Sequence, residues 1–503
     1  MSVWITSKTN ARRHGVYAIA RTPPKLIQGV GSGVVGMVGQ FPWGPPQQLV
    51  TPAGPKELID MFAPRGMDHL CSGYMSLLSK GFPSLRIVRV MADGGVPAAC
   101  TISDSLTSIQ FATITAKYPG IAGNSLVATV SEATDGDPQH FNLTVSVQGP
   151  SGSTQDVFQN LSCVSGQVTD VSAMLDRCLL VGKIVLSPAP STPTPSTTPF
   201  SGATETALSA ADYVGTPGTG DRGLSILESD KSIRGVFVDD CGNAFRATVN
   251  AGVRAHVQLM GDRIGFINGN AGMDISSVLL DVQSYRSERI VYVDPWCFTY
   301  DDVTGAEQLV PPSSFAASVA AQLSPSTSLA WKDSEVGAML SGIVRLQNDR
   351  GAGIADMTDA GIMAIQREED GGYRFEAGVL TIAPSDPSKR NITRTRMGDF
   401  IAVSFARSTR SMVDAPNTAM NRMMMVGTLQ AFMDGLVSNR DKDPAHTPYV
   451  DAYEIGELAS VNSQTELAEG DFTIPLMTRI GSSMSRIFLS ILHGETVVVR
   501  AEM

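Results

Sequence analysis

The sequence lacks the patterns that hold metal and redox centres. Its 6 cysteines are far apart, and no two have the CxxC spacing of a metal cluster or a redox pair. The 6 histidines are scattered, without an HExxH or HxH arrangement, and no GxSxG nucleophile elbow is present. These absences predict no catalytic residue, no metal site and no cofactor. The cysteines are expected to be reduced thiols that are mostly buried.

Long apolar runs are also missing. No stretch of about 18 consecutive apolar residues occurs, which predicts no membrane insertion. The beginning of the chain, MSVWITSKTNARRHG, contains no apolar core of the length that a signal peptide requires. We therefore expect the chain to fold in a cytoplasm.

Charged residues are scarce, at 17% of the 503 residues compared with roughly 25% in typical soluble proteins. A particle built from many copies needs less charged surface per chain, because contacts bury much of each copy. The net charge is −11, and no basic motif is interleaved with aromatic residues, which predicts no nucleic-acid binding.

Acidic residues are absent from the start of the chain, where the first one is Glu57. The first 25 residues carry only positive charge, in Lys8, Arg12, Arg13, Arg21 and Lys25. This segment is either a solvated arm or an arm that docks on acidic surface of the next copy, and we favour docking.

Hydrophobic periodicity indicates an α/β core. Strands are expected at 34–39, 84–91, 235–239, 263–267 and 288–293, and helices at 56–62, 68–80, 243–258, 274–286 and 417–438. Within 243–258, Phe245, Val249, Val253 and Val257 recur at a spacing of four and share one helical face. The β-α-β alternation predicts a parallel sheet with helices on its faces.

The stretch from about 98 to 185 has a different composition, rich in Thr, Ser and Val. It contains runs in which apolar and polar residues alternate. Phe141, Leu143, Val145 and Val147 alternate with polar residues, as in a half-buried strand. Five prolines follow within 187–200, SPAPSTPTPSTTPF, which predicts an extended surface linker.

The predicted fold class is therefore a discontinuous α/β core with an inserted mainly-β domain and extended N- and C-terminal β arms. The expected division is an N-terminal linking arm at 1–25, a core at 26–97 and 211–484, an inserted domain at 98–210 and a C-terminal linking strand at 485–503.

Two motifs offer an alternative reading as a nucleotide-dependent α/β enzyme. Gly31–Gly36 matches GxGxxG, but no helix is expected to open after it, so a tight strand entry is the preferred interpretation. Asp239 and Asp240 end a predicted strand, where paired carboxylates can hold Mg²⁺ or simply cap the next helix. No Gly-rich phosphate loop or third carboxylate lies nearby in the sequence.

The two ends of the chain are short β-prone runs with nothing to cover them. Unpaired strands expose backbone N–H and C=O groups and recruit partner strands. The expected exchange residues are Val3, Trp4, Ile5, Thr6, Arg486, Ile487, Phe488, Leu489, Val497, Val498 and Val499. A basic cluster before the Met-rich helix 417–438 is either an ordinary charged face or a surface that meets an acidic partner.

Several segments, in order along the chain, resemble the tail sheath proteins of contractile-tailed bacteriophages. His14-Gly15-Val16-Tyr17 is similar to the family's PGVY element, with His in place of Pro. The run from Lys117 to Leu126 is similar to the opening of the family's inserted domain, and Ala211-Asp212-Tyr213 to the return into the core. Further similar segments are Ile27–Val30, Val35–Gly39, Gly44-Pro45, Asp294-Pro295, Val310–Ser313 and Asn391–Ile401. The end of the chain departs from the family's aromatic-rich final strand.

The resemblance implies a structural subunit and not an enzyme. Subunits of this family form stacked hexameric rings around a tail tube protein, linked by exchanged strands, with baseplate and tail terminator proteins at the ends. The sheath contracts from a metastable state and drives the tube through the host envelope, for genome ejection. The implied location is the virion tail, after assembly in the host cytoplasm.

The same resemblance assigns the inserted domain to the outer surface and the Met-rich helix to the tube. The expected tube-facing residues are Arg394, Arg396, Arg407, Arg410 and Arg422. A tailocin or a secretion-type contractile machine is the alternative within this class.

Overall fold

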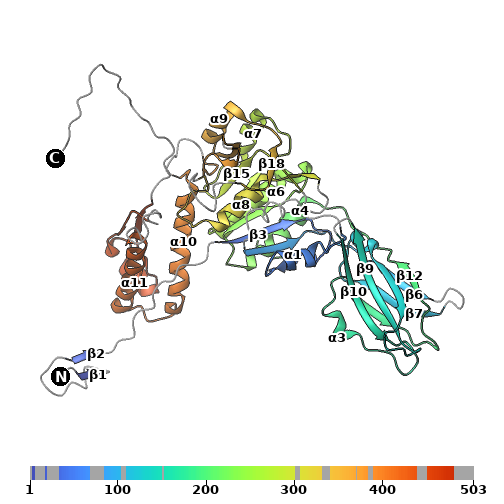
Figure 1. Cartoon of the computed structure of the whole chain (residues 1–503). Coiled ribbons are helices and arrows are strands. Elements are labelled where there is room, and N and C mark those ends of the chain that lie inside the picture. Colours follow the sequence, from blue (N-terminus) through green and yellow to red (C-terminus); the bar gives the residue numbers. More distant parts are fainter. Residues whose placement is uncertain are drawn as a thin grey trace, which may run out of the picture.

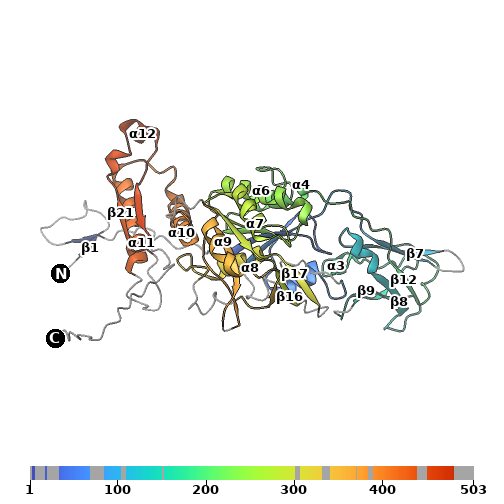
Figure 2. The same ribbon diagram turned by 90° about the horizontal axis from the view of Figure 1, so that it is seen from above.

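The computed structural model describes most of the chain. The described residues are 3–5, 17–19, 33–67, 84–103, 109–149, 152–300, 306–330, 340–369, 371–382, 389–438 and 450–480. Figure 1 shows three parts along the molecule: a central α/β body, a β domain on one side of it, and a small helical part with a β hairpin on the other. The view from above in Figure 2 shows the same succession.

An eight-stranded sheet forms the centre, and its six inner strands run parallel. Its order is β20 (Tyr373–Phe375), β19 (Ile362–Arg367), β15 (Ile290–Asp294), β14 (Ile264–Asn268), β13 (Gly235–Val238), β3 (Val34–Gly39), β5 (Ser84–Arg89) and β4 (Leu49–Val50). The inner strands are buried on both faces, which explains their continuous apolar runs. The predicted parallel sheet is confirmed.

Helices cover both faces of this sheet (Figure 1). On one face lie α6 (Asn243–Met260), α7 (Ile275–Asp281) and α9 (Ile354–Ala360), packed on Val38, Val236 and Val238. On the other lies α8 (Pro312–Gln322), packed with α1 (Pro55–Phe62) on Val35 and Met37. Val249, Val253 and Val257 of α6 are buried, as their spacing predicts.

The remaining short elements complete the body. They are α4 (Ala210–Val214), α5 (Gly223–Ile226), β16 (Cys297–Tyr300), β17 (Glu307–Val310) and β18 (Ile343–Leu346). The last three form a separate antiparallel sheet. The predicted helix at 68–80 lies outside the described residues.

The β domain is made of two sheets that share one hydrophobic core. One sheet has the order β10 (Gly152–Leu161), β9 (Phe141–Gly149), β8 (Val127–Glu132) and β12 (Ser196–Pro199), and the other β11 (Val181–Leu186), β7 (Gln110–Ala116) and β6 (Ala99–Ser103). A short helix, α3, spans Ser172–Leu175. Phe141, Leu143, Val145 and Val147 all point into the core.

The Pro-rich stretch 187–200 is extended and lies largely at the surface, as predicted, but it is part of the β domain and not a linker. Its residues Ser196–Pro199 form β12, an edge strand paired with β8. Ala189 and Phe200 are buried, and the Ala189 N–H donates to the Cys163 carbonyl over 2.8 Å. An edge strand tolerates proline because one side of its backbone needs no partner, so the proline spacing is compatible with a strand here.

One arginine fastens the β domain to the central body. Arg89, at the end of β5, is 1% exposed. Its Nε donates to the Phe41 carbonyl over 2.9 Å and its Nη1 to the Gly44 carbonyl over 2.6 Å. The same guanidinium reaches the Pro119 carbonyl of the β domain, over 3.1 and 3.2 Å. Burial lowers the pKa of Arg89 to about 10, so the group stays charged at neutral pH.

The residue after Pro119 must be a glycine. Gly120 has a φ of 131°, and a Cβ there would lie 2.8 Å from Nη2 of Arg89 and 2.6 Å from Oε1 of Glu205. Trp43 adds a second contact, because its indole N–H donates to the Leu179 carbonyl over 3.0 Å. Buried contacts therefore attach the β domain to the central body, in addition to the two chain segments that connect them.

The third part joins two helices to a hairpin. Helix α10 (Ile392–Thr409) begins at Asn391, whose side chain accepts the Thr393 N–H over 2.9 Å. Helix α11 (Ala419–Ser438) matches the predicted Met-rich helix. The strands β21 (Ala452–Ile455) and β22 (Leu476–Arg479) are antiparallel, and α12 spans Gln464–Glu469. A small core unites these elements, made of Met397, Ile401, Leu429, Met433, Leu436 and Val450.

Two N-terminal strands lie at this same end of the molecule (Figure 1). The first, β1 (Val3–Ile5), pairs in parallel with β2 (Tyr17–Ile19). The expected β conformation of Val3, Trp4 and Ile5 is therefore present, with a partner from the same chain. Thr6 and the predicted C-terminal exchange residues lie outside the described part of the chain.

Candidate assembly surfaces

The five predicted tube-facing arginines divide into exposed, half-buried and buried members. Arg407 and Arg410, at the end of α10, are exposed, and Arg394 is half-buried. Arg422, on the first turns of α11, is half-buried and donates to the carbonyl and the side-chain oxygen of Asn417, over 2.8 and 3.0 Å. Among these five arginines, only Arg407 and Arg410 are therefore exposed enough to be available to a partner.

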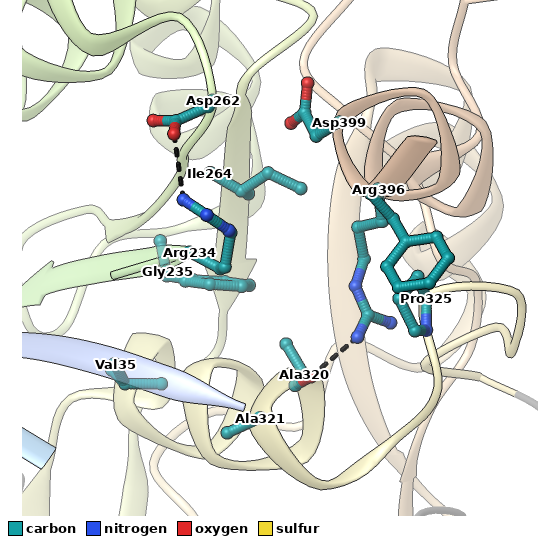
Figure 3. Close-up of a pocket in the computed structure, with 12 residues that line it drawn as sticks. Val35, Arg234, Gly235, Asp262, Ile264, Ala320, Ala321, Pro325, Arg396 and Asp399 are labelled. Carbon is teal, nitrogen blue, oxygen red and sulfur yellow. Dashed lines mark hydrogen bonds and ion pairs between the residues drawn. The ribbon is translucent and has the colours of Figure 1, made fainter. Parts of the chain in front are cut away.

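Arg396 does not face a partner, which corrects the prediction. It is 9% exposed and lies beneath α10, as Figure 3 shows. Its Nη2 donates to the carbonyls of Ala320 and Leu323, both over 2.7 Å. These carbonyls belong to the end of α8, where backbone acceptors have no partner within the helix. Arg396 is thus an internal cap of α8, favoured also by the negative end of the helix dipole.

Asp399, three residues after Arg396 on α10, makes a second contact between this helix and the sheet. Asp399 accepts two hydrogen bonds from Arg289, over 2.7 and 2.8 Å, next to the start of β15. Figure 3 shows a pocket between α10 and the sheet, where Arg396 and Asp399 lie on one side and Arg234 and Asp262, joined over 2.8 Å, on the other. Arg396 and Asp399 therefore clamp the first half of α10 to the central body, whereas its second half extends toward α11.

Exposed methionines mark the start of α11. Met420 and Met423 are 69% and 73% exposed, and Met424 is 41% exposed. Phe400 of α10 and Phe432 of α11 are in ring contact, with centroids 6.2 Å apart, and only residues 410–418 connect the two helices, so they lie antiparallel. This arrangement brings the exposed methionines to the end that carries Arg407 and Arg410. An adaptable apolar surface beside two cations is suited to a protein partner.

Sequence reasoning missed the hairpin of β21 and β22. Among the described residues these strands pair only with each other, so each has one edge without a ladder partner. A two-stranded sheet is marginal by itself and its edges are templates for further strands. Alternation in Ala452–Ile455 was the available signal, because Tyr453 and Ile455 pack on the small core and Glu454 does not.

At the edge of the central sheet where α/β enzymes bind ligands, several charged side chains pair with one another. Arg246 lies over the ring of Trp296, 5.4 Å from its centroid, and binds Asp240 over 2.8 Å. Asp294 and Arg350 form a buried pair with contacts of 2.7 and 2.9 Å. The charges of Arg246 and Asp294 at these strand ends are thus engaged within the chain, which disfavours the enzyme alternative.

The described part of the glycine motif, residues 33–36, runs directly into β3 and no helix opens there. Its last glycine, Gly36, lies inside β3, where a Cβ would come within 2.8 Å of Leu227. Asp239 is buried, and in the described ranges no group of three or more His, Cys, Asp or Glu side chains could hold a metal ion. The same ranges contain no helix that is long and apolar enough to cross a membrane.

Comparison with known proteins gives matches in structure alone. No protein-family model and no curated protein sequence matches the chain. The fold is similar to the sheath tail protein from Desulfitobacterium hafniense, with a TM-score of 0.62 and 16% identity over 88% of this chain and 93% of that chain. The sheath tail protein from Listeria innocua gives 0.56 and 14% identity over 82% and 86%.

A third similar chain comes from the structure of an assembled sheath. The helical sheath of the anti-feeding prophage, in its contracted state, gives a TM-score of 0.54 and 12% identity over 97% of this chain and 99% of that chain. These solved structures are sheath proteins and not enzymes, in agreement with the prediction of a structural subunit. The chain therefore has the fold of contractile tail sheath proteins, as its resemblance to that family predicts.

Proposed function

We propose that the chain is the repeating subunit of a contractile tail sheath. It polymerises as stacked hexameric rings around a tail tube, between a baseplate and a tail terminator, in a virion. The similarity in fold along nearly the whole chain to a contracted helical sheath carries this proposal. The β domain, at the opposite end of the molecule from α11, is the outward-facing part (Figure 1).

Strand exchange links the rings. The donors are the two ends of the chain, with residues Val3–Thr6 and Arg486–Val499, and the acceptor is the hairpin of β21 and β22. Within the described residues the hairpin offers two unpaired edges, one for each donor. A row of backbone hydrogen bonds can rotate about the sheet without breaking, so these links persist when the rings move.

Contraction is the release of a metastable packing. Two arrangements of the subunit contacts differ in free energy, and a signal from the baseplate starts the change to the more stable one. A difference of a few kcal/mol per subunit is sufficient because many copies change together. No nucleotide is consumed, and the tube is driven through the host envelope for genome ejection.

Electron microscopy of the purified full-length chain tests this function. We expect striated tubes with hexameric rings at high protein concentration. Particles that stay monomeric under all conditions of salt and concentration would refute the proposal.

The exposed arginines give a prediction about the tube. Replacing Arg407 and Arg410 together by Glu should weaken binding to an acidic tube by about tenfold or more, because two attractive contacts become repulsive. Polymerisation without a tube should be unchanged, since both side chains are exposed. Cosedimentation with the isolated tube measures the first effect and electron microscopy the second. Equal tube binding by this variant and the original chain would remove these residues from the tube contact.

A second candidate within the same class is the sheath of an injection system that carries no genome. The fold similarity to the anti-feeding prophage sheath favours it. The genes next to the coding sequence distinguish the two, since a virion needs capsid and genome-packaging proteins and an injection system does not.

A further inference from the structure

The outer face of the four-stranded sheet in the β domain carries almost no charge. Inward and outward side chains alternate along β10, β9, β8 and β12. These strands contain only two charged residues: Asp156, which is buried, and Glu132, at the last position of β8 opposite the inward-pointing Phe141. The cross-strand row in the middle of the outer face consists of Thr197, Thr129, Thr144 and Val157.

The outer face of the three-stranded sheet, on the other side of the domain, has a similar composition. Its strands β11, β7 and β6 contain one charged residue, Lys183. The central outward row here consists of Thr101, Thr113 and Val185. Val185 is 45% exposed and Val157 is 48% exposed, so each row ends in an exposed valine on an edge strand. Both sides of the β domain therefore present threonine and valine with little charge.

The rest of the β domain is acidic. Residues 98–215 contain nine acidic and three basic residues, and most of them lie in the segments between the strands. Two copies of such a domain repel each other where these segments meet. The two sheet faces avoid this repulsion, and depletion of charged residues is a mark of the centre of protein interfaces. The faces therefore suit contact with a second copy of the same domain.

The size of the faces indicates when such a contact can form. Four strands about 4.8 Å apart, each with about six residues rising about 3.3 Å, give a face of about 400 Å². A contact between two such faces buries about 800 Å² in total, less than the roughly 1,200–2,000 Å² of stable, specific interfaces. Free subunits are therefore not expected to pair through it. In a polymer, where other contacts hold the copies side by side, it adds to them.

We propose that the outer face of the β10-β9-β8-β12 sheet packs on the outer face of the β11-β7-β6 sheet of a neighbouring copy, so that β domains stack along the sheath. Contact between identical faces would close into a pair of copies, whereas contact between opposite faces continues from copy to copy. This inference rests on the proposed function and adds a contact between the outward-facing domains.

Charges introduced on the two faces of the full-length chain test the proposal. Replacing Thr144 by Lys should raise the concentration needed for polymerisation about tenfold, because the new charge is buried in the contact without a partner. Replacing Thr113 by Glu on the opposite face should have a similar effect. The chain with both changes should polymerise nearly as the original does, because the lysine of one copy then meets the glutamate of the next. Circular dichroism checks that each variant is folded.

Cross-linking tests the same contact without a new charge. The cysteines that the structure describes are all buried, so an added surface cysteine is the more accessible thiol. In the assembled chain that carries both Thr144→Cys and Thr113→Cys, a short bismaleimide should link successive copies into a ladder of multimers. Each single cysteine should give no ladder and no dimer.

The matched controls are Gln139→Lys and Gln167→Glu, at exposed positions between strands of the same domain with the same changes in net charge. Both should polymerise as the original chain does. If the face variants behave like these controls, if the double change gives no rescue, or if Thr144→Cys alone gives dimers, the inference is overturned while the proposed sheath stands. If the original chain forms no polymer, the proposed function itself fails.

Discussion

Removal of residues 486–503 should leave a soluble subunit that forms no tubes. The deletion takes away the C-terminal donor strand, and each neighbouring ring would lose a row of backbone hydrogen bonds, with a net value of about 1 kcal/mol each. It removes no residue of the described sheets and helices, so the central sheet and the β domain should keep their structure. Electron microscopy measures polymerisation, and circular dichroism measures the remaining fold.

A shorter deletion provides the control. Removal of residues 501–503 leaves both β-prone runs intact and should leave polymerisation unchanged. If the chain without 486–503 still forms normal tubes, the C-terminal strand is not a donor. If both deletions abolish tubes, the effect does not depend on the strand.

Replacement of Arg396 by Met should destabilise the junction between α8 and α10 by about 2–4 kcal/mol. The change leaves the buried carbonyls of Ala320 and Leu323 without their donor, and an unsatisfied buried acceptor costs about 1–3 kcal/mol. Hydrogen exchange of amides in α8 and α10 reports this local free energy. The expected result is faster exchange in both helices and little change in the β domain.

Replacement of Arg410 by Met is the matched control, because this arginine is exposed on the same part of the chain. It should leave the exchange of α8 and α10 unchanged. Equal exchange in the two variants would show that Arg396 does not act as the cap of α8.

Periodicity predicted the central body well, because its parallel strands and helices carry repeated apolar residues. Val249, Val253 and Val257 recur at a spacing set by the helix itself and are all buried against the sheet. In such elements the local pattern and the tertiary packing require the same residues. The α/β class followed from sequence for this reason.

Residues whose environment depends on distant segments were the ones that sequence reasoning misplaced. Arg396 lies in a basic stretch with Arg394 and resembles a surface cation, but its acceptors are more than seventy positions away along the chain. The Pro-rich stretch similarly becomes β12 only because β8 offers an edge. Burial of this kind depends on which elements meet, and a local pattern does not contain that information.

The buried hydrogen bonds of Arg89 also affect which changes in sequence this fold can tolerate. Its acceptors are backbone carbonyls of Phe41, Gly44 and Pro119, and a backbone carbonyl is present whatever the side chain. On the acceptor side, the attachment of the β domain to the body therefore depends on the path of the backbone, and Gly120 is the residue there whose identity matters. In the proposed sheath, where this domain faces outward, its outer strands and turns can therefore diversify in sequence while the junction with the body stays the same.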